Sequence, residues 1–187
     1  VSDWSSDVCS SDLDTAENPG AVTAPAVDRK IIQNAEVELG VRDVDEALNA
    51  VTQALAQSGG YVQENRVTGT REQGRQVSMT LRVPSGSFGS LLDLLRELGE
   101  VRSLRQWTND VTEEYLDLEA RIETGEAHLA QLNKLYERSG TISEMIELER
   151  EIARVTAELE SLKGRYAFLA NQVAFSTVTV SMYEPGV

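Results

Sequence analysis

Histidine and cysteine, which often carry catalysis or bind metals, are scarce in this sequence. The chain has a single histidine, His128, and a single cysteine, Cys9. A metal site or a general base needs partner residues, but neither an HExxH motif nor a paired-histidine spacing accompanies His128. We therefore expect His128 to be a surface or flanking residue, and the sequence predicts no metal site and no cofactor.

The serines of PSGSFGS (84–90) are the only candidates for a nucleophile turn. A nucleophile elbow requires GxSxG between a strand and a helix, and GSFGS lacks that pattern. Ser85 or Ser87 is instead expected to cap the following helix. Neighbouring acids on predicted helix exteriors are typical of solvated coiled-coil flanks: Glu113, Glu114, Glu149 and Glu151. No catalytic residue is assigned, and we do not expect an enzyme.

Composition limits the possible partners. The 187 residues carry a net charge of −14, and nucleic acid is not an expected partner because phosphate binding requires a basic surface. Hydrophobic residues make up 41% and charged residues 26%, which is typical of a folded globular protein. No stretch has the length and apolar content of a transmembrane helix.

The N-terminal segment does not read as part of the fold. DWSSDVCSSDL (3–13) resembles the translation of a common sequencing adapter, and we interpret residues 1–13 as non-native. A lipid-bearing cysteine should follow an apolar run, and the VSDWSSDV that precedes Cys9 has none. The small residues, prolines and acids of 14–28 predict a disordered tether.

The first half of the remaining chain alternates between two periodicities. Apolar residues at every second position predict strands, and apolar residues three and four apart predict helices. The predicted order is strand 31–41, a helix from Asp43 to Gly59, strand 61–68, strand 77–83, helix 88–98 and a weaker strand 101–108. This β-α-β-β-α-β order predicts an α+β fold of the split βαβ, ferredoxin-like sandwich type.

Residues 111–173 follow a seven-residue repeat instead. Ser139 and Gly140 interrupt it, and Thr141 with Glu144 forms a capping box for a second helix. Two helices joined so closely fold back on each other, which predicts an antiparallel coiled-coil hairpin that projects about 45–50 Å at 1.5 Å per residue. Its predicted seam comprises Tyr115, Leu118, Ile122, Leu129, Leu132, Tyr136, Met145, Leu148, Ile152, Val155, Leu159, Leu162, Tyr166, Leu169 and Val173.

Alternating β-branched residues at 177–183 predict a final strand. A strand that follows the hairpin should return to the sheet, so we predict one domain over 29–187 with the hairpin inserted in it. The sheet would then hold both ends of the arm. Gly125 in the seam and Gly164 near it are unusual, because glycine costs up to about 1 kcal/mol in a helix. Close helix approach and a bend are both open explanations.

Five sequence strings carry a resemblance to a known family. In order they are RKIIQNAEVELGVRDVDEAL, SGGYVQE, MTLRVPSGSF, DVTEEYLDLEARI and FSTVTVSMYE. Together they resemble the bacterial domain of unknown function 4349 family over about Arg29–Glu184. The resemblance implies a domain on the outer side of the cytoplasmic membrane, attached by a lipid or signal anchor before the tether or by a helix after the domain. It transfers no catalytic residues.

Two functions of different classes fit these observations. The first is a non-enzymatic, membrane-tethered extracytoplasmic module whose arm mediates self-association or contact with a protein partner. The second is a small-ligand-sensing domain of an envelope signalling protein, for which Tyr61, Arg105 and Trp107 are the candidate binding residues.

Overall fold

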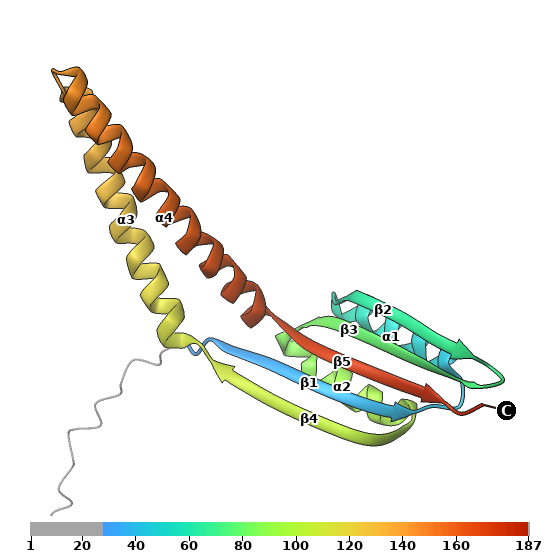
Figure 1. The fold of residues 1–187 in the computed structure, drawn as a ribbon. Coiled ribbons are helices and arrows are strands. Elements are labelled where there is room, and N and C mark those ends of the chain that lie inside the picture. The colour runs from blue at the N-terminus through green and yellow to red at the C-terminus, as the bar shows by residue number, and fades with distance from the viewer. Residues whose placement is uncertain (1–27, 187) are drawn as a thin grey trace, which may run out of the picture.

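A computed structural model describes residues 28–186, so the predicted adapter segment 1–13 and all of the predicted tether except Asp28 lie outside the described residues. A small α+β body carries a long helical hairpin (Figure 1). The elements in order are β1 (Ile31–Gly40), α1 (Val44–Ser58), β2 (Tyr61–Thr70), β3 (Gly74–Pro84), the 3-10 turn η1 (Ser85–Ser87), α2 (Phe88–Leu98), β4 (Glu100–Asp110), α3 (Thr112–Arg138), α4 (Ile142–Ala174) and β5 (Phe175–Glu184).

The five strands form one mixed sheet in the order β2-β3-β5-β1-β4. β5 runs parallel to β1 and antiparallel to β3, so the last strand returns to the sheet and occupies its centre. The predicted α+β class is confirmed. The ferredoxin-like detail is not confirmed, because β5 separates β1 from β3, which that four-stranded arrangement would place side by side. The hairpin is thus inserted between an edge strand, β4, and the central strand.

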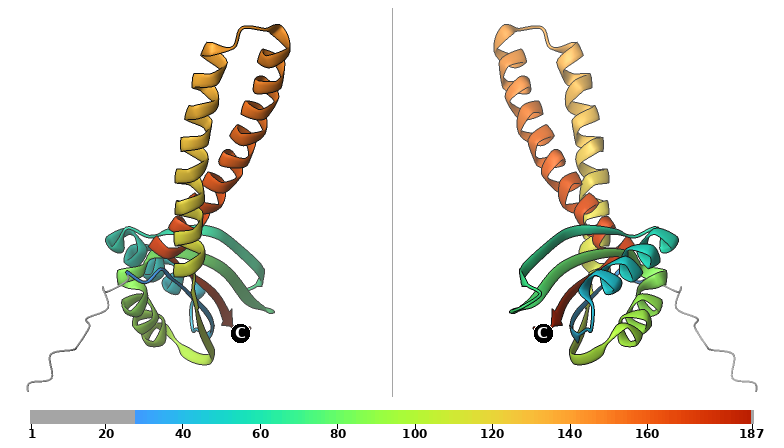
Figure 2. Two further views of the ribbon diagram at one scale, coloured as in Figure 1. Left: turned by 90° about the vertical axis from the view of Figure 1, so that its left-hand side faces the viewer. Right: turned by 90° about the vertical axis from the view of Figure 1, so that its right-hand side faces the viewer.

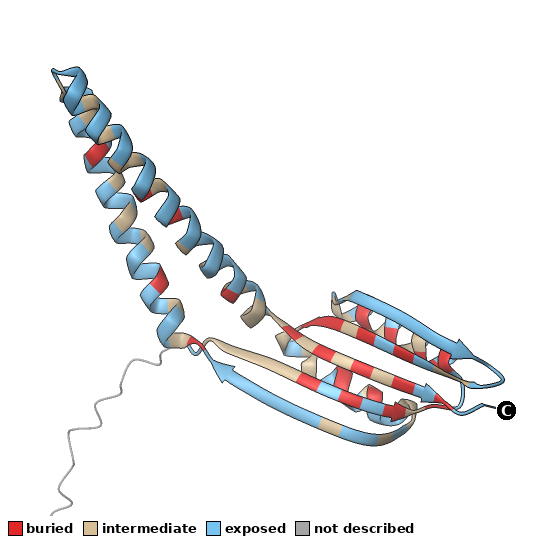
Figure 3. Ribbon diagram, viewed as in Figure 1, coloured by how far each residue is buried: buried red, intermediate tan, exposed pale blue. Residues whose placement is uncertain are grey.

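One face of the sheet is covered and the other is open. α1 and α2 lie on the same face (Figure 2), and alternate side chains of the central strands are buried beneath them, among them Val37 of β1 and Val180 of β5. Residues that alternate with these, such as Glu36 and Glu38, are exposed on the opposite face, so buried and exposed bands alternate along β1 (Figure 3). The sheet and the two short helices therefore share one core, and the open face is free to carry polar side chains.

The helix ends follow the sequence signals in two cases. The Asp43 carboxylate accepts hydrogen bonds from the amides of Asp45 and Glu46, and Gly59 ends α1 in the left-handed conformation, with φ of 79°. Thr141 caps α4 by accepting from the Glu144 amide at 3.3 Å. In both places a local sequence motif was sufficient to define the helix end.

The prediction that Ser85 or Ser87 caps the second helix is wrong. Ser87 occupies the N-cap position of α2, but its side chain makes no capping bond. The Ser85 hydroxyl instead donates to the carbonyl oxygens of Val173 and Ala174 at the end of α4. The last carbonyls of a helix have no partner within it, and a hydroxyl brought close by the tertiary fold satisfies them.

The far end of β5 is tied to the start of α1 by a charged cluster. The Glu184 carboxylate accepts from the Val44 amide at 2.8 Å and from the Arg75 guanidinium at 2.7 Å. Arg75 also pairs with Asp45 at 3.0 Å. The bond from the Val44 amide, followed by the bond from Arg75, holds the pKa of Glu184 below its ordinary value. The charged form of Glu184 is thus the one that the folded state favours.

We expect Glu184→Gln to remove part of the loss of stability that the parent protein shows as the pH falls into the acid range. Because the folded pKa of Glu184 is depressed, its contribution is full above the unfolded pKa, about 4.3, and is lost as the pH falls through the lower folded pKa. The melting temperature of the parent protein should therefore exceed that of the variant most at neutral pH, and the difference should shrink below about pH 5. Thermal melts across this range measure it.

The matched control is Glu36→Gln, which alters an exposed glutamate on the open face. A difference between parent and Glu184→Gln that stays constant from neutral to acidic pH would contradict the assignment. Some acid sensitivity should persist in the variant, since Arg75 and Arg71 also lower the pKa of Asp45.

Candidate functional site

The helical hairpin is the most distinctive surface of the molecule. α3 and α4 are antiparallel, and ion pairs cross between them from Arg165 to Glu114 at 2.8 Å and from Lys163 to Glu126 at 2.6 Å. These pairs are half-exposed, so each is worth little energy, about 0–1 kcal/mol. They mainly define the register of the two helices, because a shift of one helix along the other would separate the paired charges.

Every predicted seam residue is buried or half-buried, and the outward positions of both helices are mostly exposed (Figure 3). The structure brings most of them together in two apolar clusters. The lower cluster contains Tyr115, Leu118, Leu162, Tyr166, Leu169 and Val173, packed with Ile32 and Val111 at the sheet. The upper cluster contains Leu129, Leu132, Leu148, Ile152, Val155 and Leu159. Ile122, Tyr136 and Met145 are half-buried and belong to neither cluster.

The two seam glycines have different surroundings. A Cβ atom at Gly125 would lie 2.6 Å from Cδ2 of Leu159, whereas a Cβ at Gly164 would meet nothing within 4 Å. Leu159 therefore occupies the space that a larger residue at position 125 would need. Close approach explains Gly125, and nothing in the packing explains Gly164.

The first end of the arm is fixed to Lys30, the residue that precedes β1. The Val111 amide donates to the Lys30 carbonyl at 2.8 Å, and the Lys30 amide donates to the Thr112 hydroxyl at 2.9 Å. Just above, the Tyr115 and Tyr166 hydroxyls are 2.8 Å apart and join α3 to α4. This hydrogen bond and burial raise the pKa of Tyr166 above its ordinary value.

The second end of the arm is fixed by a buried arginine. Arg82 of β3 is only 3% exposed. Its guanidinium donates to the side chains of Asn171, at 2.7 Å, and Gln172, at 3.1 Å, near the end of α4, and to the Thr177 hydroxyl on β5. One side chain thus joins β3, the arm and the central strand.

The partners of Arg82 are uncharged oxygens, although a buried cation normally needs a countercharge. The C-terminal end of α4 supplies one, because aligned peptide dipoles give it partial negative charge. Arg82 also reaches the Asn171 carbonyl there, at 3.4 Å, and the Ser85 hydroxyl covers the next carbonyls. Both ends of the arm are therefore held by hydrogen bonds that the sheet provides.

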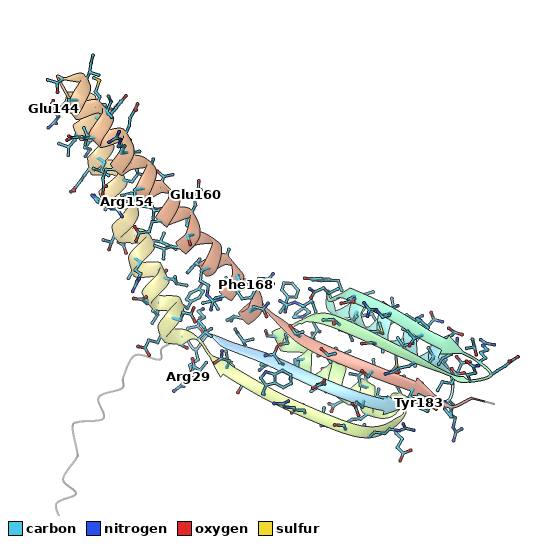
Figure 4. All side chains as sticks on the ribbon, viewed as in Figure 1. Arg29, Glu144, Arg154, Glu160, Phe168 and Tyr183 are labelled. Atoms are coloured by element: carbon cyan, nitrogen blue, oxygen red, sulfur yellow. The ribbon has the colours of Figure 1, made fainter. Side chains whose placement is uncertain are left out.

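The tip of the arm exposes apolar side chains. Leu135 is 53% exposed and Ile142 is 77% exposed, with Ile146 nearby on α4. Leu135 borders a depression of about 430 Å³ at the junction of the helices, close to the position of Glu144 in Figure 4. The end of the arm therefore presents both apolar and acidic side chains to solvent.

The residues considered as catalytic or metal-binding candidates do not come together in one site. His128 is exposed on the arm beside Arg121 and Arg154, and the paired acids of α3 and α4 are largely exposed. Within residues 28–186 no three His, Cys, Asp or Glu side chains are arranged to hold a metal ion. In the same part of the chain, no helix combines the length and apolar character needed to span a membrane.

The three predicted ligand-binding residues are separated. Trp107 and Arg105 are neighbours on β4, with the guanidinium 5.1 Å from the ring centre. Tyr61 lies on β2, at the opposite edge of the sheet, where it packs on Phe175. No sequence pattern pointed to Phe168 of α4, which borders the same depression as Trp107 because of the way the arm leaves the sheet.

We expect Arg82→Ala to lower the free energy of unfolding by about 2–3 kcal/mol, because it removes the charge-assisted bonds that join β3 to the end of α4 and to β5. Urea denaturation measures this. Arg82→Lys should give an intermediate loss, since an ammonium group cannot reproduce the forked geometry. Arg66→Ala, at an exposed position on neighbouring β2, is the control and should change stability by less than about 0.5 kcal/mol. An equally small change for Arg82→Ala would contradict the anchoring role.

The comparisons with known proteins place the chain in a family by its sequence. No curated protein and no solved structure shows significant similarity to the chain. A family model, Domain of unknown function (DUF4349), matches residues 29–187, which include the sheet, both short helices and the entire arm. This match covers most of the sequence, and the chain therefore belongs to the DUF4349 family.

Proposed function

We propose that this protein is a non-enzymatic assembly module of the bacterial cell envelope, in which the arm projects from a compact base and associates with a second copy of the chain. The observation that carries the proposal is the exposed apolar tip of an arm whose two ends are both fixed to the sheet. A fixed base gives the tip a defined position, so binding there loses less conformational freedom than binding by a flexible tail would.

The length of the arm supports a role at a distance from the base. The 33 residues of α4 span about 50 Å at 1.5 Å per residue. α4 continues directly into β5, without a connecting loop. The tip is therefore connected to the central strand of the sheet by one continuous helix.

Charge at the tip favours a second copy as the partner. The depression beside Leu135 has Arg138 on the α3 side and Glu144 and Glu147 on the α4 side. A two-fold axis at the tip would bring the arginine of each copy to the acids of the other, and the leucines would meet between them. The contact is small, so the association should be weak and suited to many copies held on one membrane.

We expect the purified protein to dimerise in a concentration-dependent way and Leu135→Glu to weaken the dimer at least tenfold, because each arm would place a new carboxylate beside Glu144 and Glu147. Sedimentation velocity measures the equilibrium. Leu116→Glu is the matched control: Leu116 is 49% exposed, comparable with Leu135, but lies at the base of α3. A protein that stays monomeric up to about 1 mM would refute tip association, since that limit means binding weaker than about −4 kcal/mol.

The location outside the cytoplasmic membrane is part of the proposal and rests on the family resemblance and the predicted tether. Reading the gene from its source DNA through both ends tests it. We expect a signal sequence with a lipidated cysteine or a signal anchor upstream, or an apolar span of about 20 residues downstream. A reading frame that begins with a plain methionine near residue 14 and ends at Val187 would refute the envelope location.

A further inference from the structure

We propose that the angle between the arm and the open face of the sheet is a binding site for one ring of a neutral saccharide. The site is a depression of about 530 Å³ bounded by β1, β4 and the lower part of α4. We call it the elbow site. This volume lies within the range of small-ligand pockets, about 300–1,000 Å³.

Two aromatic rings from distant parts of the sequence border the elbow site. Trp107 of β4 is 43% exposed and Phe168 of α4 is 52% exposed, although large apolar rings are usually buried. Phe168 lies at the base of the arm on the side of the sheet (Figure 4). The C–H face of a sugar ring packs on such surfaces, and its hydroxyls remain at the edge to form hydrogen bonds.

The polar groups of the elbow site are mainly uncharged. Asn34 is paired with Trp107 across β1 and β4, so both side chains lie on the open face, and Asn109 follows on the same side of β4. Gln172 completes the set from α4, and because its oxygen accepts from Arg82, its NH2 group is held in place as a donor. Amides both donate and accept, as the hydroxyls of a sugar do.

The charges around the elbow site are balanced. Arg165 stacks on Phe168, 5.6 Å from the ring centre, and is paired with Glu114 at 2.8 Å. Arg105 stacks on Trp107, and Glu36 is its direct cross-strand partner. An anionic ligand would meet the acids and a cationic ligand the arginines, so a neutral ligand is favoured.

A saccharide fits this geometry better than an extended peptide. A peptide strand gains most of its affinity by pairing with an open sheet edge. The elbow site lies on the face of β1 and β4, and the unpaired backbone groups of the edge strand β4 point along the plane of the sheet, away from that face. A ligand at the elbow site would therefore be recognised by side chains, and these are mainly aromatic rings and amides.

Tryptophan fluorescence provides the test. The chain has two tryptophans, Trp4 and Trp107, so Trp4→Phe leaves Trp107 as the sole tryptophan of the full-length protein. We expect chitotriose or maltotriose, two neutral trisaccharides, to change its emission with half-saturation on the order of 1 mM or lower. Glucosamine trimer, a cationic relative of chitotriose, and a capped alanine tripeptide are the competing probes.

Variants locate the binding. Phe168→Ala, on an exposed helix position, should weaken binding about tenfold or more with an unchanged melting temperature. Tyr183→Ala is the matched control, because Tyr183 is also an exposed aromatic with an arginine, Arg102, 5.1 Å from its ring centre. It lies at the opposite end of the sheet (Figure 4), and its loss should leave binding unchanged.

Three outcomes would overturn the proposal. The first is no change in Trp107 emission with either neutral trisaccharide up to about 20 mM, which would leave no affinity of biological use. The second is stronger binding of the tripeptide or the glucosamine trimer. The third is equal affinity in the parent and Phe168→Ala. None of these outcomes bears on tip association, so the two proposals succeed or fail separately.

Discussion

The attachment of the arm to the sheet depends on one buried arginine, which is hydrogen-bonded to both. Arg82 comes from β3, yet its hydrogen bonds go to the end of α4 and the start of β5. Its positive charge is placed at the negative end of a 33-residue helix, which makes burial of the cation tolerable without a carboxylate. Because α4 passes into β5 at this point, the same contact sets the direction of the arm.

The place of β5 explains why an insertion of this size does not destabilise the sheet. β5 pairs along its length with both β1 and β3, so the chain that returns from the arm completes the centre of the sheet. Its inward side chains, from Ser176 to Glu184, are buried under α1 and α2. Folding of the body thus requires the two ends of the hairpin to meet, and the paired helices hold those ends together.

The arm has two surfaces with different chemistry. The tip has exposed leucine and isoleucine beside charges of both signs, which suits contact with a protein. The elbow site has aromatic rings, amides and balanced charge, which suits a neutral polar ligand. Since the base of α4 contributes Phe168 and Gln172 to the elbow site, a ligand there would contact the same helix that leads to the tip.

Local patterns in the sequence were enough to predict most of the helices and strands and the helical arm. Period-two and seven-residue repeats predicted the strands and the seam, and local motifs at Asp43 and Thr141 defined two helix starts, because these signals involve residues close together in the chain. The strand order, the role of Ser85, the partners of Arg82 and the shared depression of Trp107 and Phe168 became apparent only in the folded structure. The physical reason is that these contacts join segments tens of residues apart, whose encounter depends on how the whole sheet assembles and leaves no periodic pattern in the sequence.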